Sequence, residues 1–212
     1  MRFLCLHGAG TSAEIFEIQS GGITYDLAKK GHTFKYANGY MEDAVEPQLK
    51  DIFPGPFYSH YPRDRAPGEK LAPAIKHVQQ IIESDGPFDA VMGFSQGAAI
   101  AAAMIAQHAQ THQEPLFKLA VFICAATPFD STGNEFLSAP AGEYPIQIPT
   151  THIVGKQDPL YAYSMRLFRL CEPGKAQFYD HGSKHMVPFD MKITEAMVAA
   201  IEVSIRRALG LE

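Results

Sequence analysis

The chain contains 212 residues, of which 46% are apolar and 19% are charged, values typical of a globular protein that can bury one core. Its formal net charge is −5 and it contains no run of five or more Lys or Arg residues, which argues against nucleic acid as a partner. It has no apolar stretch of about 18 residues. Its three cysteines lack the spacing of a disulfide framework or a zinc site, which favours a reducing compartment. We therefore expect a cytoplasmic protein, and the missing apolar stretch predicts that it has no membrane span.

Short apolar runs alternate with helical patterns along the chain. Strands are predicted at residues 2–6, 33–36, 88–92, 118–124, 151–154 and 176–179, and helices at residues 13–30, 95–110, 159–170 and 190–209. This alternation predicts an α/β fold with a mostly parallel central sheet of about six strands and helices on both faces. No repeat or linker divides the chain, so residues 1–212 are expected to form one domain. Catalytic groups in such sheets gather at the carboxyl ends of the strands.

The first predicted strand ends in a glycine-rich turn, Leu6-His7-Gly8-Ala9-Gly10. A tight turn at this place can aim backbone N–H groups at a reaction centre above the strand ends. We assign one such donor to the N–H of Ala9, with Gly10 as the alternative, and we expect His7 to brace the turn. A plain glycine turn without a chemical role is the competing interpretation.

Residues 37–68 interrupt the alternation, since they are rich in proline, glycine and aromatic residues and have weak periodicity. Loops of this length are usually functional or disordered, and the aromatic residues argue against disorder. We expect a short cap or pocket wall over the strand ends, with an ordered surface loop as the alternative. The predicted substrate pocket consists of Phe57 and Tyr58 of this loop together with Phe129 and Met186.

The strongest motif is Gly93-Phe94-Ser95-Gln96-Gly97, which lies between a predicted strand and a predicted helix. A sharp turn of this kind exposes the serine hydroxyl and requires small flanking residues, which the two glycines supply. The N–H of the residue after the serine and the positive end of the helix dipole both suit a developing oxyanion. Ser95 is therefore the predicted nucleophile, and Gln96 is predicted to provide the second oxyanion donor.

The acid that orients the catalytic base is expected after a late strand, since the order in this kind of site is Ser, Asp, His. Asp158 follows the strand predicted at residues 151–154, and Asp130 follows the strand before it. We favour Asp158, although the proline at position 159 also suits a helix start that this residue would cap.

Two histidines, His181 and His185, lie in the loop after the last predicted strand, and position alone separates them poorly. The other histidines, including His60 and His77, are interpreted as surface or packing residues. The chain contains no P-loop, no G-x-G-x-x-G, no H-E-x-x-H and no C-x-x-C motif. The chemistry expected of Ser95 needs neither a metal nor a cofactor.

Five segments, in order along nearly the whole chain, resemble a fungal serine hydrolase family that also contains the human ovarian-cancer-gene homologues. The segments are LCLHGAGTSAEIF, GPFDAVMGFSQGAA, VFICAATPF, VGKQDP and GSKHMVP. The resemblance implies the α/β-hydrolase fold and places the catalytic triad of the family on Ser95, Asp158 and His185.

A subgroup of this family is more similar still, since its HGAG turn and GPFY segment occur here. It consists of stand-alone thioesterases of fungal polyketide gene clusters, which implies an acyl thioester as substrate and an acyl carrier protein domain as partner. A carboxylesterase acting on small free esters is the main alternative, and a non-catalytic binding protein is a remote one.

Basic groups would distinguish the first two alternatives, because carrier domains are usually acidic. Clustering of Arg63, Arg65, Arg166 and Arg169 around the opening above Ser95 would favour the thioesterase, and a scattered arrangement would favour the esterase. The sequence does not define the oligomeric state, and a homodimer is one expectation.

Overall fold

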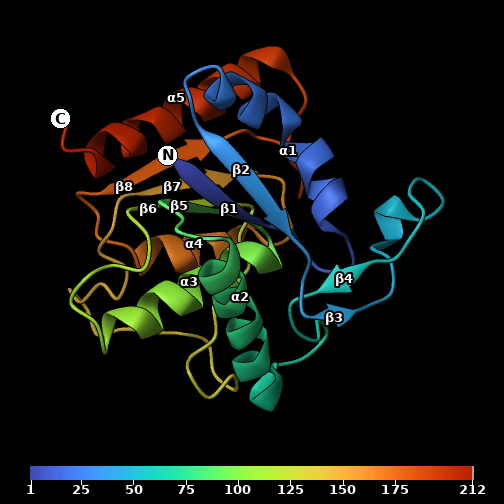
Figure 1. The fold of residues 1–212 in the computed structure, drawn as a ribbon, viewed down its shortest axis with the longest axis horizontal. Coiled ribbons are helices and arrows are strands. Elements are labelled where there is room, and N and C mark those ends of the chain that lie inside the picture. The colour runs from blue at the N-terminus through green and yellow to red at the C-terminus, as the bar shows by residue number, and fades with distance from the viewer. Residues whose placement is uncertain (212) are drawn as a thin grey trace.

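A six-stranded parallel sheet forms the centre of the computed structural model, which describes residues 1–211 (Figure 1). The strands lie in the order β2-β1-β5-β6-β7-β8, and each neighbouring pair is parallel. They are β1 (Arg2–Leu6), β2 (Thr33–Ala37), β5 (Ala90–Phe94), β6 (Leu119–Ile123), β7 (Thr150–Val154) and β8 (Ala176–Asp180). The prediction of a parallel sheet of about six strands is confirmed.

Helices cover both faces of this sheet, as predicted (Figure 1). One face carries α1 (Ala13–Ala28) and α5 (Met191–Ala208), and the other carries α2 (Leu71–Asp85), α3 (Gln96–Ala109) and α4 (Tyr161–Arg169). The strands are buried from both sides because alternate side chains enter the two apolar layers. No helix within residues 1–211 is long and apolar enough to cross a membrane.

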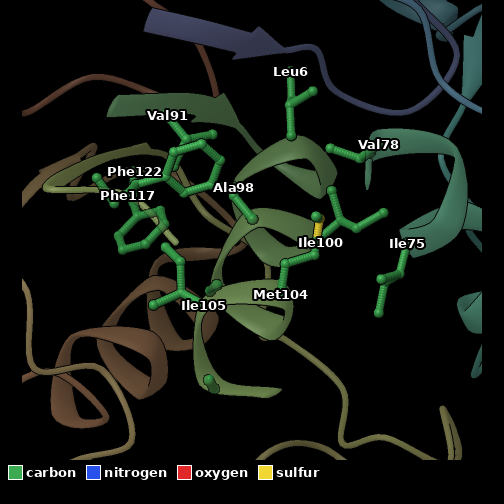
Figure 2. Close-up of a cluster of buried hydrophobic side chains, with 14 of the residues drawn as sticks. Leu6, Ile75, Val78, Val91, Ala98, Ile100, Met104, Ile105, Phe117 and Phe122 are labelled. Atoms are coloured by element: carbon green, nitrogen blue, oxygen red, sulfur yellow. The ribbon is translucent and has the colours of Figure 1, made fainter. Parts of the chain in front are cut away.

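The apolar layer between the sheet and α3 fixes the start of that helix. Leu6, Val91 and Phe122 of the sheet pack with Ile100 and Ile105 of α3 (Figure 2). The alanine-rich stretch of α3 is fully buried, which lets this helix lie close to β5. Because α3 begins directly after β5, the packing holds the turn between them at the carboxyl edge of the sheet.

The direction in which the chain crosses the sheet reverses between β1 and β5. From β1 the chain moves outward to β2, and it then returns past β1 to β5 and continues to β8. Loops that leave the two strands at such a point diverge, so a crevice opens at their carboxyl ends. The glycine-rich turn after β1 and the serine turn after β5 lie at this crevice.

Helix α2 is not among the predicted elements. Its apolar residues recur with helical spacing at positions 71, 74, 75, 78, 81 and 82, and Pro73 lies in its first turn, where proline is tolerated. Its sequence therefore carries the signal of an amphipathic helix. The predicted elements all exist, and their ends agree with the observed ends within two residues.

The variable segment, defined here as residues 38–70, joins β2 to α2. It contains the short antiparallel strands β3 (Met41–Glu42) and β4 (Tyr58–Ser59), which lie beside the main sheet (Figure 1). It also contains the 3₁₀ turns η1 (Pro47–Leu49) and η2 (Gly68–Lys70). The backbone of Tyr58 exchanges two hydrogen bonds with that of Thr11, at 2.6 and 3.2 Å. This loop is therefore ordered and attached to the turn after β1.

Candidate active site

Ser95 lies at the sharp turn between β5 and α3. Its φ of 53° and ψ of −113° fall in a region that residues with a side chain rarely adopt. The turn is held by its own main chain, because the Ser95 N–H donates to the Ile123 carbonyl at 2.9 Å and the Ser95 carbonyl accepts from the Ala126 N–H at 3.2 Å. A Cβ at Gly97 would lie 2.1 Å from the carbonyl oxygen of Leu6, so this position requires glycine.

Asp158 and His185 are joined by a short hydrogen bond. His185 Nδ1 donates to Asp158 Oδ2 at 2.7 Å, and the Leu160 N–H donates to Asp158 Oδ1 at 2.7 Å. Burial alone would raise the pKa of Asp158, but the hydrogen bonds from His185 and Leu160 hold it below its usual value. The carboxylate is therefore charged, and a neutral His185 keeps Nε2 as its proton acceptor.

Ser95 and His185 line one cavity, which has a volume of about 800 Å³. The His185 ring packs against Phe94 with a centroid distance of 4.9 Å, which holds the imidazole beside the serine turn. Ser95 Oγ forms no hydrogen bond with any of the described residues. In unliganded enzymes the contact between nucleophile and base is often long and tightens when substrate binds.

Asp130 and His181, the alternative acid and base, have other surroundings. The Asp130 carboxylate accepts from a threonine hydroxyl at 2.8 Å within a tight turn, and Asp130 is not among the described residues that line the cavity. His181 is buried, and its Nε2 lies 3.5 Å from Cys124 Sγ. Of the two candidate acids and the two candidate bases, the structure joins Asp158 to His185.

The two backbone groups predicted to stabilise an oxyanion are available. Ala9 and Gln96 both line the cavity. Their N–H groups donate to no acceptor within residues 1–211. The N–H of Gly10, the alternative donor, is engaged by Ser59 Oγ at 2.9 Å. The geometry therefore favours Ala9 over Gly10.

His7 braces the turn after β1, in agreement with the prediction. Its Nδ1 donates to the Gly8 carbonyl at 2.6 Å, and its Nε2 accepts from the Gly39 N–H at 2.8 Å. Burial lowers the pKa of His7 to about 4, so the neutral ring keeps both contacts. His60 is also fully buried and donates to the His7 carbonyl at 3.0 Å. No local pattern around His60 signals that contact.

Aromatic rings form a continuous wall of the cavity. Tyr61 packs on Phe129 at 6.0 Å, Phe129 on Phe136 at 5.0 Å, and Phe136 on Tyr163 at 5.9 Å between ring centroids. All four residues line the cavity. The variable segment adds polar lining residues, namely Glu46, Gln48, Arg63, Asp64 and Arg65.

The residues predicted for the substrate pocket divide into two pairs. Phe129 and Met186 line the cavity, whereas Phe57 and Tyr58 are not among its lining residues within the described chain. The prediction for Phe57 and Tyr58 is therefore corrected. Tyr58 belongs to β4, and strand pairing decides which side chains of a hairpin face a site. Tyr61 is the aromatic residue of the variable segment that lines the cavity.

The four arginines considered for carrier docking also divide. Arg63 and Arg65 line the cavity, while Arg166 and Arg169 line a separate hollow on the surface. Arg63 is paired with two carboxylates of the variable segment, at 3.2 and 3.0 Å. The arginines thus form no single cluster around the opening above Ser95.

One trio of side chains has the donors of a metal site. Cys124, Asp158 and His185 each offer one ligand atom, with these atoms within 4.8 Å of one another, and no other such trio occurs within residues 1–211. This donor set suits zinc. Asp158 and His185 already bond to each other, however, and burial raises the pKa of the Cys124 thiol, which keeps it protonated.

The sheet order, the serine turn and the Asp–His pair together define an α/β-hydrolase. A carboxylesterase from Mesorhizobium loti has a similar fold, with a TM-score of 0.63 over 95% of this chain and 88% of that chain at 14% identity. The carboxylesterase of Bacillus cereus gives a TM-score of 0.59 over 94% of this chain and 87% of that one at 15% identity. At these identities the likeness concerns the fold.

The chain belongs to the family described as serine hydrolase (FSH1), whose model matches residues 1–197. Esterase FPY3 of Fusarium mangiferae is 35% identical over 99% of both chains. Hydrolase phiM of Talaromyces stipitatus is 30% identical over 95% of this chain and 86% of its own length. The predicted family is confirmed, the chain is a hydrolase, and the alternative of a non-catalytic binding protein is set aside.

Proposed function

We propose that this hydrolase cleaves a thioester or ester through an acyl-enzyme, with Ser95 as nucleophile, His185 as general base and Asp158 as the acid that orients the base. The carrying observation is the 2.7 Å hydrogen bond between His185 and Asp158 at a cavity that Ser95 also lines. A serine hydroxyl is a weak nucleophile until a base removes its proton, and the base needs a partner that fixes its tautomer.

The reaction begins when His185 Nε2 accepts the Ser95 proton while Oγ attacks the acyl carbonyl carbon. The resulting oxyanion is stabilised by the N–H groups of Ala9 and Gln96. The intermediate then collapses, the C–S or C–O bond breaks, and His185 returns the proton to the leaving thiol or alcohol. Water attacks the acyl-enzyme with His185 again as base, which releases the acid and restores Ser95. Asp158 stays ionised and stabilises the charged imidazole.

The substrate we favour is an acyl thioester presented by an acyl carrier protein domain. The cavity volume of about 800 Å³ lies toward the upper end of the range for sites that bury drug-sized ligands, and a short-chain ester would leave much of it unfilled. The wall of Tyr61, Phe129, Phe136 and Tyr163 offers apolar surface to a bulky acyl group. The similarity to stand-alone thioesterases of polyketide clusters supports a carrier-bound donor.

A carboxylesterase for small free esters is the second candidate, because it would use the same catalytic groups. The relative FPY3 is named an esterase, and the division of the arginines favours this alternative. Within residues 1–211, Arg65 is the one cavity-lining cation that has no carboxylate partner. Docking of an acidic carrier would therefore depend mainly on Arg65.

A substrate comparison separates the two candidates. Hydrolysis of N-acetylcysteamine, pantetheine and carrier-protein thioesters is measured against matching oxygen esters, for wild type and Ser95→Ala. Strong preference for the carrier-bound thioester, lost in Ser95→Ala, supports the thioesterase. Equal or faster hydrolysis of short free esters, with no gain from the carrier, assigns a carboxylesterase.

We also propose a cytoplasmic location and a homodimer. The location is supported by Cys5, Cys124 and Cys171, which are all free and buried, as is common in a reducing compartment. Fractionation of the source cells tests the location. Sedimentation equilibrium tests the dimer, and a mass of one chain across the concentration range would exclude it.

A further inference from the structure

His60 connects the two sides of the proposed oxyanion site. It follows β4 in the variable segment, and its side chain is fully buried. Its Nε2 donates to the His7 carbonyl at 3.0 Å, and its backbone N–H donates to Oε1 of Gln96 at 2.7 Å. One residue of the variable segment therefore contacts both the turn after β1 and the first residue of α3.

The hydrogen bonds of His60 define the state of its ring. A carbonyl oxygen only accepts, so Nε2 carries the proton and Nδ1 is bare. Nδ1 is buried without a partner among the described residues. Burial and the neighbouring His7 lower the pKa of His60 well below its usual value, so the ring is neutral. A buried nitrogen without a partner is unfavourable, which makes histidine a poor choice for filling space alone. The hydrogen bond from Nε2 to the His7 carbonyl is therefore the contact that explains a histidine at this position.

The His7 carbonyl lies where the two oxyanion donors approach each other. It is two residues before Ala9, and a Cβ at Gly97 would lie 2.6 Å from its oxygen, so the start of α3 touches the same carbonyl. The rings of His7 and His60 also stack, with centroids 5.1 Å apart. The His60 ring therefore contacts the turn after β1 at the carbonyl that the start of α3 also approaches.

The Gln96 side chain closes this network from the helix. Its Nε2 donates to the Tyr61 carbonyl at 2.8 Å, while its Oε1 accepts from His60. On the other side, Ser59 Oγ accepts from the Gly10 N–H at 2.9 Å. Residues 59–61 of the variable segment thus hold both backbone stretches that carry the proposed donors.

We propose that His60 is a positioning residue that sets the spacing of the Ala9 and Gln96 N–H groups and so couples the variable segment to catalysis. This inference rests on the oxyanion site proposed above. His60 acts through the His7 carbonyl and the Gln96 side chain, without contact to the substrate. Donor spacing matters most when negative charge develops, so its loss lowers kcat more than it changes KM.

The test compares His60→Leu and His60→Gln with wild type, using p-nitrophenyl butyrate. Leucine fills the space without a donor, whereas the glutamine amide can still donate to the His7 carbonyl. Removing one oxyanion donor costs about 10²–10³-fold in kcat, so a displaced donor should cost about tenfold to a hundredfold. We expect that loss for His60→Leu with little change in KM, and recovery of most of it in His60→Gln.

A second readout reports on the oxyanion itself. A trifluoromethyl ketone forms a tetrahedral adduct with the serine, so its inhibition constant should rise in His60→Leu by the factor by which kcat/KM falls. Ile201→Ala, in the buried face of α5, is a matched control for lost packing. It should lower the thermal midpoint and leave that constant unchanged. If His60→Leu does not fold, Gln96→Met tests the same network, because it removes both amide contacts and keeps the backbone N–H.

Three results for His60→Leu overturn the proposal. These are a wild-type kcat in His60→Leu, a change in KM alone, or an inhibition constant that does not follow kcat/KM. Equal impairment of His60→Gln and His60→Leu would also reject the role of the donor. Ser95→Ala separates this failure from that of the proposed function. An inactive Ser95→Ala beside a fully active His60→Leu removes the His60 proposal alone, whereas an active Ser95→Ala removes both.

Discussion

The two sides of the cavity are built in different ways. Ser95, Asp158 and His185 lie one, four and five residues beyond the ends of β5, β7 and β8, so the central sheet fixes their positions directly. The variable segment has two short strands and two 3₁₀ turns of its own, and contacts such as those of His60 attach it to the turn after β1. The proposed catalytic groups therefore depend on the packed sheet, whereas the variable segment beside them depends on a few long-range hydrogen bonds.

The largest expected effect concerns the sheet side. Asp158→Asn keeps the shape of the side chain but removes the charge that holds His185 in the correct tautomer, so kcat is expected to fall about 10⁴-fold. Steady-state hydrolysis of p-nitrophenyl butyrate measures this loss. Asp130→Asn is the matched control and should retain wild-type kcat. A large loss in Asp130→Asn with a small one in Asp158→Asn would move the role to the other acid.

The same contrast explains what the sequence could predict. The strands and the serine turn could be predicted from local patterns, because apolar runs, glycine spacing and the start of the following helix each involve only a few neighbouring residues. Strand order narrowed the choice of the acid to Asp130 or Asp158 and the choice of the base to His181 or His185. The family resemblance favoured Asp158 with His185, and the fold shows their contact across 27 residues.

The variable segment could not be predicted to the same depth. Tyr58 is an aromatic residue of this segment, yet its strand pairs with Thr11 and with β3, and it does not line the cavity within the described chain. Tyr61, three residues further, does line it. The choice between them depends on pairing with distant residues, which no local pattern records. The buried place of His60 depends on the same pairing.

A second expected effect is the pH dependence of the free energy of unfolding, to which buried histidines of both regions contribute. Burial lowers the pKa of His7 to about 4 and that of His152, in β7, to about 3, and it lowers the pKa of His60 well below its usual value. The unfolded chain binds protons near pH 6.5 while the folded chain does not. Each histidine therefore contributes its full stability above about pH 6.5 and loses it as pH falls toward the folded pKa, by about 1.4 kcal/mol per pH unit.

Urea unfolding between pH 7 and pH 4.5 measures this dependence. His152→Phe removes one titrating group from the scaffold, where the ring packs on Phe122 and Phe168, and should make the slope shallower. It leaves His7 and His60 in place, so part of the slope should remain. A free energy of unfolding that stays constant from pH 6.5 to pH 5 would contradict the neutral state of these rings.

The smallest expected effect lies at the rim of the variable segment. Arg65→Glu should raise KM for a carrier-bound thioester by about three- to tenfold, because it reverses the charge of the one cavity-lining cation among residues 1–211 that has no carboxylate partner. It should leave KM for the N-acetylcysteamine thioester unchanged. Steady-state kinetics at low and high salt measure both values, and added salt should reduce the difference. Arg169→Glu, outside the cavity, is the control. Equal effects on both thioesters would argue against carrier docking at this rim.

The central claim is that Ser95, which the central sheet holds in place at the cavity, is the nucleophile. Peptide mass spectrometry after reaction with a fluorophosphonate, on wild type and on a Ser95→Ala variant of unchanged thermal midpoint, tests it most directly. The account predicts one adduct per chain, located on Ser95 and absent from the variant. An adduct on another residue of the wild type, or undiminished labelling of folded Ser95→Ala, would contradict it.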